Sequence, residues 1–102
     1  MKVFISGKVS NLPYKQVKEK FIKAEIILHH KGYKTINPVR IIPPDTPQPV
    51  AMKKCLMQLL NCDAIYMLPD WKQSPGATLE HEVAKQCGLR IIEEEACLDH
   101  IK

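Results

Sequence analysis

Glu80 is a carboxylate in a segment whose pattern predicts a helix, and it lies beside the expected core side of that helix. At about 100° per residue it lines up with Ala77 and Ala84, so small residues flank it and leave a hollow. The expected core stripe consists of Leu79, Val83 and Cys87. A partly desolvated carboxylate in a hollow could act on a bound ligand as a nucleophile. The alternative is a boundary glutamate that reaches water past two alanines.

The loop before this helix is the second candidate part of a site. Ser74 followed by Pro75 is typical of an N-cap and first turn, and Gly88 of a C-cap, so the helix is predicted from Ser74 to about Cys87. Gly76 would let a ligand approach the backbone, where the free amides and the helix dipole attract an anion. The alternative is a plain helix start, which is the more common use of Ser-Pro-Gly.

Hydrophobic periodicity and turn residues divide the chain into alternating strands and helices. Strands are predicted at residues 1–6, 33–36, 64–68 and 89–92, and helices at residues 13–31, 50–61 and 74–87. This order is typical of an α/β fold. We therefore expect a single three-layer Rossmann/flavodoxin-like domain over residues 1–102, with a four- to five-stranded parallel sheet. Ligands of such sheets bind beyond the carboxyl ends of the strands.

Further candidates follow the predicted strands at that edge: Ser6, Gly7 and Lys8 after the first, Asn37 after the second, and Asp70 and Trp71 after the third. The first three could bind phosphate or a base, and Asn37 could donate to a ligand. Trp71 could stack on a base or sugar, and Asp70 lies at the right end of the sheet to reach a ligand. The structural alternatives are a turn glycine at position 7, a capping asparagine at 37 and a hydrophobic plug at 71.

Two other segments are less regular. Residues 39–49 (VRIIPPDTPQP) contain four prolines, which exclude a long helix or central strand, and predict a loop that is either a lid or a rigid surface connection. Residues 93–102 (EEEACLDHIK) are acidic and weakly helical. The core faces of the first two helices are expected at Val17, Phe21, Ala24, Ile27 and Leu28, and at Met52, Cys55, Leu56, Leu59 and Leu60.

The composition narrows the class of protein. Hydrophobic residues form 45% and charged residues 25% of the chain, which predicts a packed core. The net charge of +4 is spread along the chain without interleaved aromatic residues, so it favours an anionic small molecule over nucleic acid. No apolar run is long enough for a membrane span, and MKVFISG is too short for a signal peptide, so we expect a cytoplasmic protein.

No cofactor or metal is expected. The cysteines contain no CxxC pair and the histidines lack ligand spacing, so free thiols in a reducing compartment are the natural interpretation of Cys55, Cys62, Cys87 and Cys97.

Four stretches together resemble the nucleoside 2-deoxyribosyltransferase-like superfamily, most closely a branch of short bacterial and phage proteins. They are VFISGKVS, GYKTINP, LLNCDAIYMLPDW and SPGATLEHEVAKQCG, and they span most of residues 2–92. The specific element is S-x-G-x-x-x-E, from Ser74 to Glu80. The resemblance implies chemistry at the N-glycosidic bond of a deoxynucleoside or its 5′-monophosphate, in a homo-oligomer.

The resemblance also implies roles for individual residues. A glutamate at the position of Glu80 attacks the anomeric carbon, the base departs, and water or a second base resolves the resulting ester. Ser74 matches the serine that holds the 5′-phosphate in deoxynucleoside monophosphate N-glycosidases, where transferases of free nucleosides have aspartate. Gly76 and residues 6–8 would hold phosphate or sugar.

The chain departs from the family pattern in the second helix. Transferases of this type have an acidic residue there, whereas this chain reads MKKCLMQ. Protonation of the leaving base would then need Asp70, a residue of another subunit, or water. Two alternatives remain open, a non-catalytic nucleotide-binding module of the same fold and an interaction domain of flavodoxin-like shape.

Overall fold

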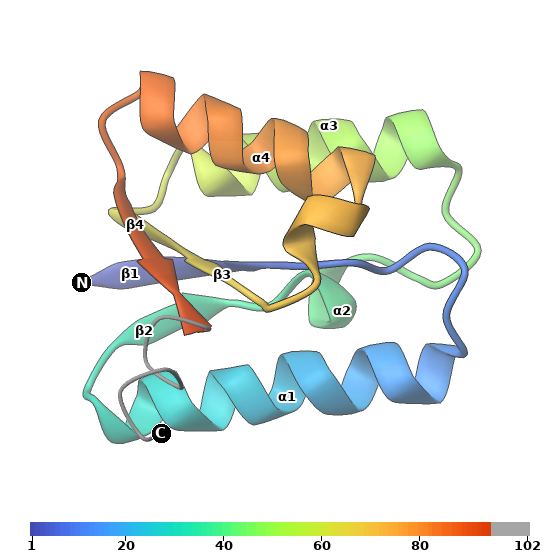
Figure 1. Cartoon of the computed structure of the whole chain (residues 1–102), viewed down its shortest axis with the longest axis horizontal. Coiled ribbons are helices and arrows are strands. Elements are labelled where there is room, and N and C mark those ends of the chain that lie inside the picture. The colour runs from blue at the N-terminus through green and yellow to red at the C-terminus, as the bar shows by residue number, and fades with distance from the viewer. Residues whose placement is uncertain (95–102) are drawn as a thin grey trace.

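The chain forms a sheet of four parallel strands in the order β2-β1-β3-β4, with helices on both faces (Figure 1). The structure is a computed structural model and describes residues 1–94. The strands are β1 (Lys2–Ser6), β2 (Lys34–Ile36), β3 (Ala64–Met67) and β4 (Arg90–Glu93). The helices are α1 (Tyr14–His30), α2 (Pro38–Ile41), α3 (Gln48–Leu59) and α4 (Pro75–Gln86), with a 3₁₀ turn η1 at Trp71–Gln73. The α/β class and the parallel sheet are as predicted.

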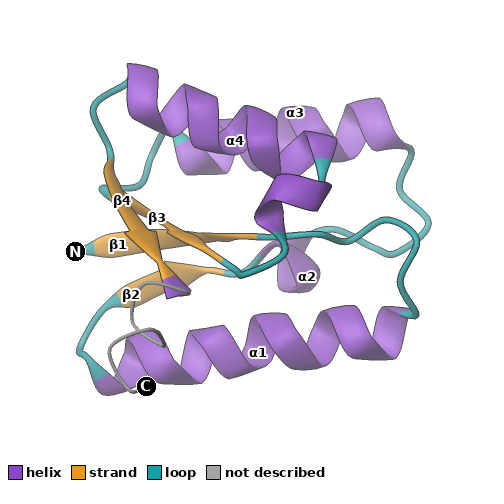
Figure 2. Cartoon of the chain, viewed as in Figure 1, coloured by secondary structure: helices purple, strands orange, loops and turns teal. Residues whose placement is uncertain are grey.

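The strand order creates one edge where a ligand can bind. The chain passes from β1 outward to β2 and then returns to the other side of β1 with β3, so the order reverses between β1 and β3. Helix α1 covers one face of the sheet, whereas α3 and α4 cover the other (Figures 1 and 2). The loops after β1 and β3 therefore diverge to opposite faces, which leaves a crevice at the carboxyl ends of these strands.

Alternate residues of β1 face the two layers, as the two-residue period of a strand requires. Val3 and Ile5 are buried in the cluster with α1, and Phe4 is buried in the cluster with α3 and α4. Ser6 is the last residue of β1 and, by the same alternation, faces α4. The strand thus ends with a fully buried hydroxyl on the α4 side.

Helix α4 buries a different face from the one predicted. Its buried residues are Ala77, Glu80 and Ala84, whereas Leu79 is 44% exposed and Cys87 is exposed. Only Val83 of the predicted stripe packs against the core. Because alanine side chains are short, this face lets α4 lie close to the sheet. The face with the small residues and the carboxylate is therefore the core face itself.

Smaller differences concern the other helices. Ile27 is only half-buried and Leu60 is exposed, because they lie at the margins of the buried faces of α1 and α3. The proline-rich segment is not all loop. Asn37 accepts a hydrogen bond from the Val39 amide at 3.0 Å and caps the single turn α2, and α3 begins at Gln48 with a proline in its first turn. Proline is tolerated in a first turn because the amide there needs no partner in the helix.

The predicted ends of two helices are confirmed by the backbone. Gly32 and Gly88 follow α1 and α4 with φ of +85° and +76°, a conformation that glycine adopts without strain. The interpretation of the acidic C-terminal segment lies largely outside the described residues, because 95–102 are not among them.

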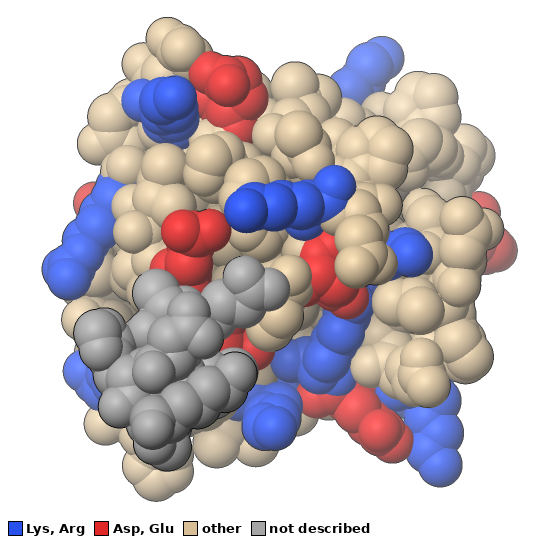
Figure 3. Space-filling view, in the orientation of Figure 1, with Lys and Arg blue, Asp and Glu red and all other residues tan. Residues whose placement is uncertain are grey.

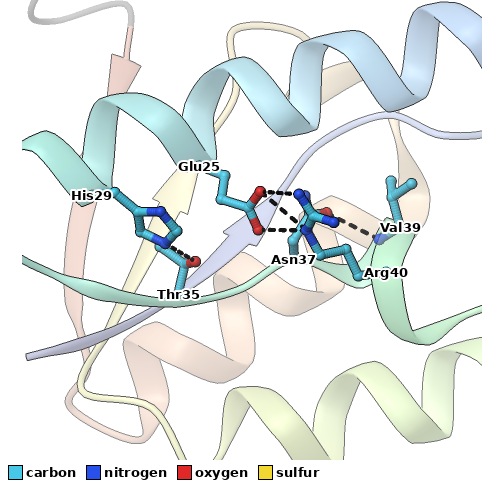
Figure 4. A network of polar contacts seen from close by, with 6 residues as sticks. All are labelled: Glu25, His29, Thr35, Asn37, Val39 and Arg40. Carbon is cyan, nitrogen blue, oxygen red and sulfur yellow. Dashed lines mark hydrogen bonds and ion pairs between the residues drawn. The ribbon is translucent and has the colours of Figure 1, made fainter.

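An ion pair between a buried glutamate and an exposed arginine fastens α2 to α1 (Figure 4). Glu25 is only 7% exposed, and its carboxylate accepts hydrogen bonds from Arg40 Nε at 2.9 Å and Nη2 at 2.7 Å. Arg40 lowers the pKa of Glu25 and outweighs the opposing effect of burial. In the same region His29 Nε2 contacts Thr35 Oγ1 at 2.9 Å, which links the end of α1 to β2. Strand β2 and the helix α2 that follows it are thus each held to α1.

We predict that Arg40→Ala lowers the thermal unfolding midpoint at pH 7, because Glu25 would remain buried without its partner. A carboxyl whose pKa is lowered on folding stabilises the fold above its unfolded pKa, and this contribution disappears as the pH falls through the folded value. The difference in unfolding midpoint between wild type and variant should therefore become smaller as the pH is lowered to about 3. Differential scanning fluorimetry at a series of pH values measures this difference. Arg40→Lys keeps the positive charge but cannot make two parallel hydrogen bonds, so its unfolding midpoint should lie between those of the wild type and Arg40→Ala. A difference between wild type and Arg40→Ala that is as large at pH 3 as at pH 7 would contradict this account.

Candidate functional site

A cavity of about 410 Å³ lies at the carboxyl end of β1. Its wall consists of the end of β1 with the loop that follows, the first two turns of α3, and the first two turns of α4, together with Phe21 of α1 and Pro38 of α2. Five of the candidate residues from the sequence meet here, namely Ser6, Gly7, Ser74, Gly76 and Glu80. The fold therefore brings together side chains from opposite ends of the chain at the predicted edge of the sheet.

Glu80 presents its carboxylate to this cavity from the second turn of α4. The side chain is 7% exposed, and Ser6 Oγ donates a hydrogen bond to Glu80 Oε1 at 2.5 Å. This contact joins the end of β1 to α4 across the sheet-facing side of the helix. The carboxylate is thus fixed by the strand that ends beneath it.

Burial is the main influence on the ionisation of Glu80. Desolvation raises the pKa of this carboxyl to about 7, although the hydrogen bond from Ser6 acts in the opposite direction. At neutral pH the charged and uncharged forms are consequently both populated. Such a group can donate a proton, accept one, or attack an electrophile.

The start of α4 forms the adjacent part of the wall. Ser74 Oγ accepts a hydrogen bond from the Ala77 amide at 3.1 Å, so Ser74 is the N-cap that the sequence predicts. Its hydroxyl proton is free to point to a ligand, because the oxygen acts as acceptor in the cap. The first turn of a twelve-residue helix also carries partial positive charge, which suits an anionic group.

Two glycines in the wall have close neighbours, and the contact at Gly7 is the stricter one. A β-carbon at Gly7 would lie 2.8 Å from the Cβ of Leu68, which is closer than such atoms approach. A β-carbon at Gly76 would lie 3.1 Å from the methyl carbon of Met52 on α3, the flexible end of a side chain that can shift slightly. Glycine at position 7 therefore lets the end of β1 meet the loop after β3.

Asp70 and Lys8 do not line the cavity. Asp70 Oδ1 accepts from the Lys8 amide at 3.0 Å, and its other oxygen pairs with Lys20 Nζ of α1. This carboxylate joins the loops after β1 and β3 to the helix beneath them. Its observed contacts are those of a residue that fixes loop geometry.

Trp71 and Asn37 are also absent from the cavity wall. Trp71 stacks on His81 with ring centroids 4.2 Å apart, and its Nε1 donates to Glu93 at 3.2 Å, within the α3 and α4 cluster. Asn37 caps α2. Trp71 therefore packs in the core as a hydrophobic plug and Asn37 acts as a cap, which were the structural alternatives to ligand binding.

Cys55 and Gln48 line the cavity although sequence reasoning did not select them. Cys55 was assigned to the core because of its spacing, which is correct but incomplete, since the core face of α3 continues into the cavity wall. Gln48 was placed in the proline-rich loop. No local signal marks either residue, because their roles depend on where α3 lies against α4.

A second cavity of about 310 Å³ adjoins the first. It lies between α1, α2 and the proline-rich segment, and it shares Ser10, Pro38, Gln48 and Cys55 with the wall of the first cavity. No lysine, arginine, aspartate or glutamate among residues 1–94 contributes to the second wall. The two cavities differ in charge, because the first contains the Glu80 carboxylate and the described wall of the second is uncharged.

Metal-binding clusters, membrane-spanning helices and disulfides are further features that could indicate a function. Within residues 1–94, no cluster of three or more His, Cys, Asp or Glu side chains could hold a metal ion, and no helix has the length and hydropathy to cross a membrane. Cys55, Cys62 and Cys87 form no disulfide. On the face shown in Figure 3, positive and negative side chains are interspersed.

The sheet order and the cavity at its point of reversal define an α/β domain of the doubly wound type. The chain belongs to the family described as "Domain of unknown function (DUF4406)", whose model matches residues 1–93. No curated protein matches it. Among solved structures, it resembles the CMP N-glycosidase BcmB of Clostridium botulinum, with a TM-score of 0.61 and 23% identity over 91% of this chain and 67% of that chain. At this identity the likeness shows a common fold, and it agrees in broad terms with the superfamily resemblance.

We predict that Glu80→Gln stabilises the protein at pH 8 but not at pH 4. A carboxyl whose pKa is raised on folding binds its proton more tightly in the native state. The free energy of unfolding therefore falls as the pH rises from the unfolded to the folded pKa of this group. The neutral amide avoids this cost, which is roughly 3 kcal/mol or less. Chemical denaturation of both proteins at each pH measures the difference. A variant that is less stable at pH 8 than the wild type would contradict the assignment.

Proposed function

We propose that this protein cleaves the N-glycosidic bond of a nucleoside or nucleoside 5′-monophosphate, with Glu80 as the nucleophile. A carboxylate oxygen forms a bond to C1′ as the bond from C1′ to the base nitrogen breaks. The bonding electrons leave with the base, which takes up a proton. Water, or a second base, then attacks C1′ and releases Glu80.

The observation that carries this proposal is the placement of Glu80. Its carboxylate is buried, anchored by Ser6 and open to a cavity beside a helix N-terminus. An oxocarbenium-like transition state develops positive charge at C1′, which a nearby carboxylate stabilises. At a carboxylate as buried as Glu80 this stabilisation is stronger than in water, because screening by solvent is weaker.

The ionisation of Glu80 suits such a reaction at neutral pH. With a pKa of about 7, a substantial fraction of the carboxyl is charged and able to attack. The raised pKa also means that the carboxylate is more basic than an exposed glutamate. We expect the rate of base release to rise with pH across this range, as the charged form accumulates.

A 5′-phosphate would bind at the start of α4. Ser74 and Gly76 line the cavity there, and the helix dipole favours an anion. No lysine or arginine among residues 1–94 lines the cavity, so amides and hydroxyls would carry this contact. The uncharged second cavity is large enough to receive the base.

The comparisons support the proposal by analogy. The fold is shared with a protein whose name is CMP N-glycosidase, and the motif from Ser74 to Glu80 matches the superfamily described above. Fold likeness by itself does not determine activity, so the argument depends on the site. We propose that the domain of residues 1–102 acts in a homo-oligomer, as the family resemblance implies.

A nucleotide-binding module without turnover is the second candidate, and one observation favours it. Within the described residues, Glu80 is the only carboxylate on the cavity wall, and Asp70 pairs with Lys20. The described residues therefore offer no second acid there to protonate the leaving base. In the catalytic proposal, solvent or another subunit would supply that proton.

We predict that Glu80→Ala abolishes release of free base from deoxynucleoside and ribonucleoside 5′-monophosphates, with a loss of about 1,000-fold or more. Chromatography of the reaction products measures it, and calorimetry tests whether nucleotide binding persists. Glu82→Ala, an exposed glutamate on the same helix, is the matched control and should keep full activity. No base release by the wild type with any nucleotide, together with measurable binding, would favour the binding module.

We predict that Ser74→Gly weakens the reaction of the 5′-monophosphate but not that of the free nucleoside. Glycine is tolerated at an N-cap at a cost of a few tenths of a kcal/mol, so the helix should survive. Loss of a hydrogen bond to a charged group should raise KM for the monophosphate by roughly 10- to 100-fold. Equal effects on both substrates would contradict a phosphate contact at Ser74.

A further inference from the structure

The two cavities meet along one side of α3. They share a strip of wall whose members are Val9, Ser10, Pro38, Gln48, Ala51 and Cys55. Three of these six residues belong to α3, at positions 48, 51 and 55. Spacings of three and four residues place side chains on one side of a helix. This row of α3 therefore forms the boundary between the first cavity and the second.

The groups proposed to hold the sugar and the phosphate lie on one side of that boundary. Glu80, Ser74 and Gly76 line the first cavity and are absent from the wall of the second. In a nucleotide the base and the phosphate arm leave from different carbons of the sugar ring, so they need different parts of the site. Attack of a carboxylate on C1′ also requires the base to depart on the opposite side of the ring. The base should therefore point away from Glu80.

The second cavity has a wall that suits an uncharged, planar ring. Most of its described residues are apolar, among them Leu12, Val39 and Ile42. At the boundary, Ser10 and Gln48 add a hydroxyl and a carboxamide. Neither side chain makes a hydrogen bond to another described residue, so both can bind the polar edge of a base.

Ala51 has the smallest side chain of the row on α3. It is half-buried, and it lies between Gln48 in the turn before and Cys55 in the turn after. A longer side chain at this position would project into the boundary, because the residue lines both cavities. Its neighbour Met52 lines only the first cavity. Position 51 is therefore the place on α3 where added bulk would separate the two spaces.

We propose that the two cavities are halves of a single nucleotide site, and that the small side chain of Ala51 lets the base extend from the first cavity into the second. The sugar and the 5′-phosphate occupy the first cavity. This inference rests on the proposed function for the class of its ligand, but it concerns binding and does not require turnover. Ala51 is then a residue that determines specificity, since it sets the room available to the base.

Methyl groups on the two walls provide the test. Val39 and Ile42 line only the second cavity, whereas Met52 and Ala77 line only the first. We expect nucleoside 5′-monophosphates to shift the methyl NMR signals of both pairs. The titration uses Glu80→Gln, which keeps the side-chain shape but lacks the proposed nucleophile, so the ligand is not consumed. Shifts at Met52 and Ala77 alone would overturn the proposal.

A ligand without a base is the matched probe. We expect 2-deoxyribose 5-phosphate to leave Val39 and Ile42 unshifted, because it has no group that enters the second cavity. Shifts at these two residues with the sugar phosphate would overturn the assignment of the halves. If the sugar phosphate binds too weakly to shift any signal, the nucleotide titration decides.

Substitution of Ala51 tests the role of the boundary. Ala51→Leu should weaken the binding of nucleoside 5′-monophosphates by about 10-fold or more in calorimetry and abolish their shifts at Val39 and Ile42. Val50→Leu is the control, because Val50 is 43% exposed and lines neither cavity, and it should bind as the wild type does. Equal affinities in the two variants, or an equal loss for the sugar phosphate, would overturn the role of Ala51. Thermal unfolding verifies the fold, and Ala51→Met replaces a leucine variant that does not fold.

Base release by the wild type separates this inference from the proposed function. If no base is released but nucleotides shift the signals of both walls, the proposed function fails and the two-part site stands. If base is released while Val39 and Ile42 stay unshifted, the two-part site fails and the proposed function stands. The absence of binding by every nucleoside 5′-monophosphate would contradict both.

Discussion

The burial of one carboxylate that has no cationic partner among the described residues is the constraint on which the rest of this site depends. Glu80 is held by the Ser6 hydroxyl, a neutral donor, so the protein stabilises the charged form only in part. A buried charge with this support would be costly if it were always ionised. The pKa of about 7 reduces this cost, because a substantial fraction of the group is protonated and neutral near pH 7.

The fold supplies the geometry for this arrangement through the order of its strands. Because β3 returns to the opposite side of β1 from β2, the ends of β1, α3 and α4 meet around one cavity. Asp70 ties the loops after β1 and β3 to Lys20 of α1, and the ion pair between Glu25 and Arg40 fixes α2. These contacts lie outside the cavity but determine the shape of its wall. These charged side chains thus stabilise the surrounding segments, and among the described residues only Glu80 brings a charged side chain to the cavity wall.

The chemistry offered by the cavity is narrow. It provides one carboxylate near its point of half-ionisation, a helix start for an anion, and an adjoining uncharged space. Those features match a nucleoside monophosphate in three places, at the sugar, the phosphate and the base.

The sequence by itself determined the alternation of strands and helices, the turn glycines at positions 32 and 88, the capping role of Ser74 and the row of Ala77, Glu80 and Ala84. These depend on residues close together in the chain, where periodicity and turn chemistry act directly. The short helix α2 and the earlier start of α3 were missed, because proline-rich segments carry both loop and first-turn signals.

Only the tertiary structure decided which face of α4 is buried, that Asp70 pairs with Lys20, and that Cys55 and Glu80 line one cavity. Helical spacing gives the angles between side chains but not the rotation of a helix against its sheet, so Leu79 was expected inside and lies outside. The contact between Ser6 and Glu80 joins residues 74 positions apart. Contacts of that kind depend on strand order and helix packing, which no local pattern in the chain specifies.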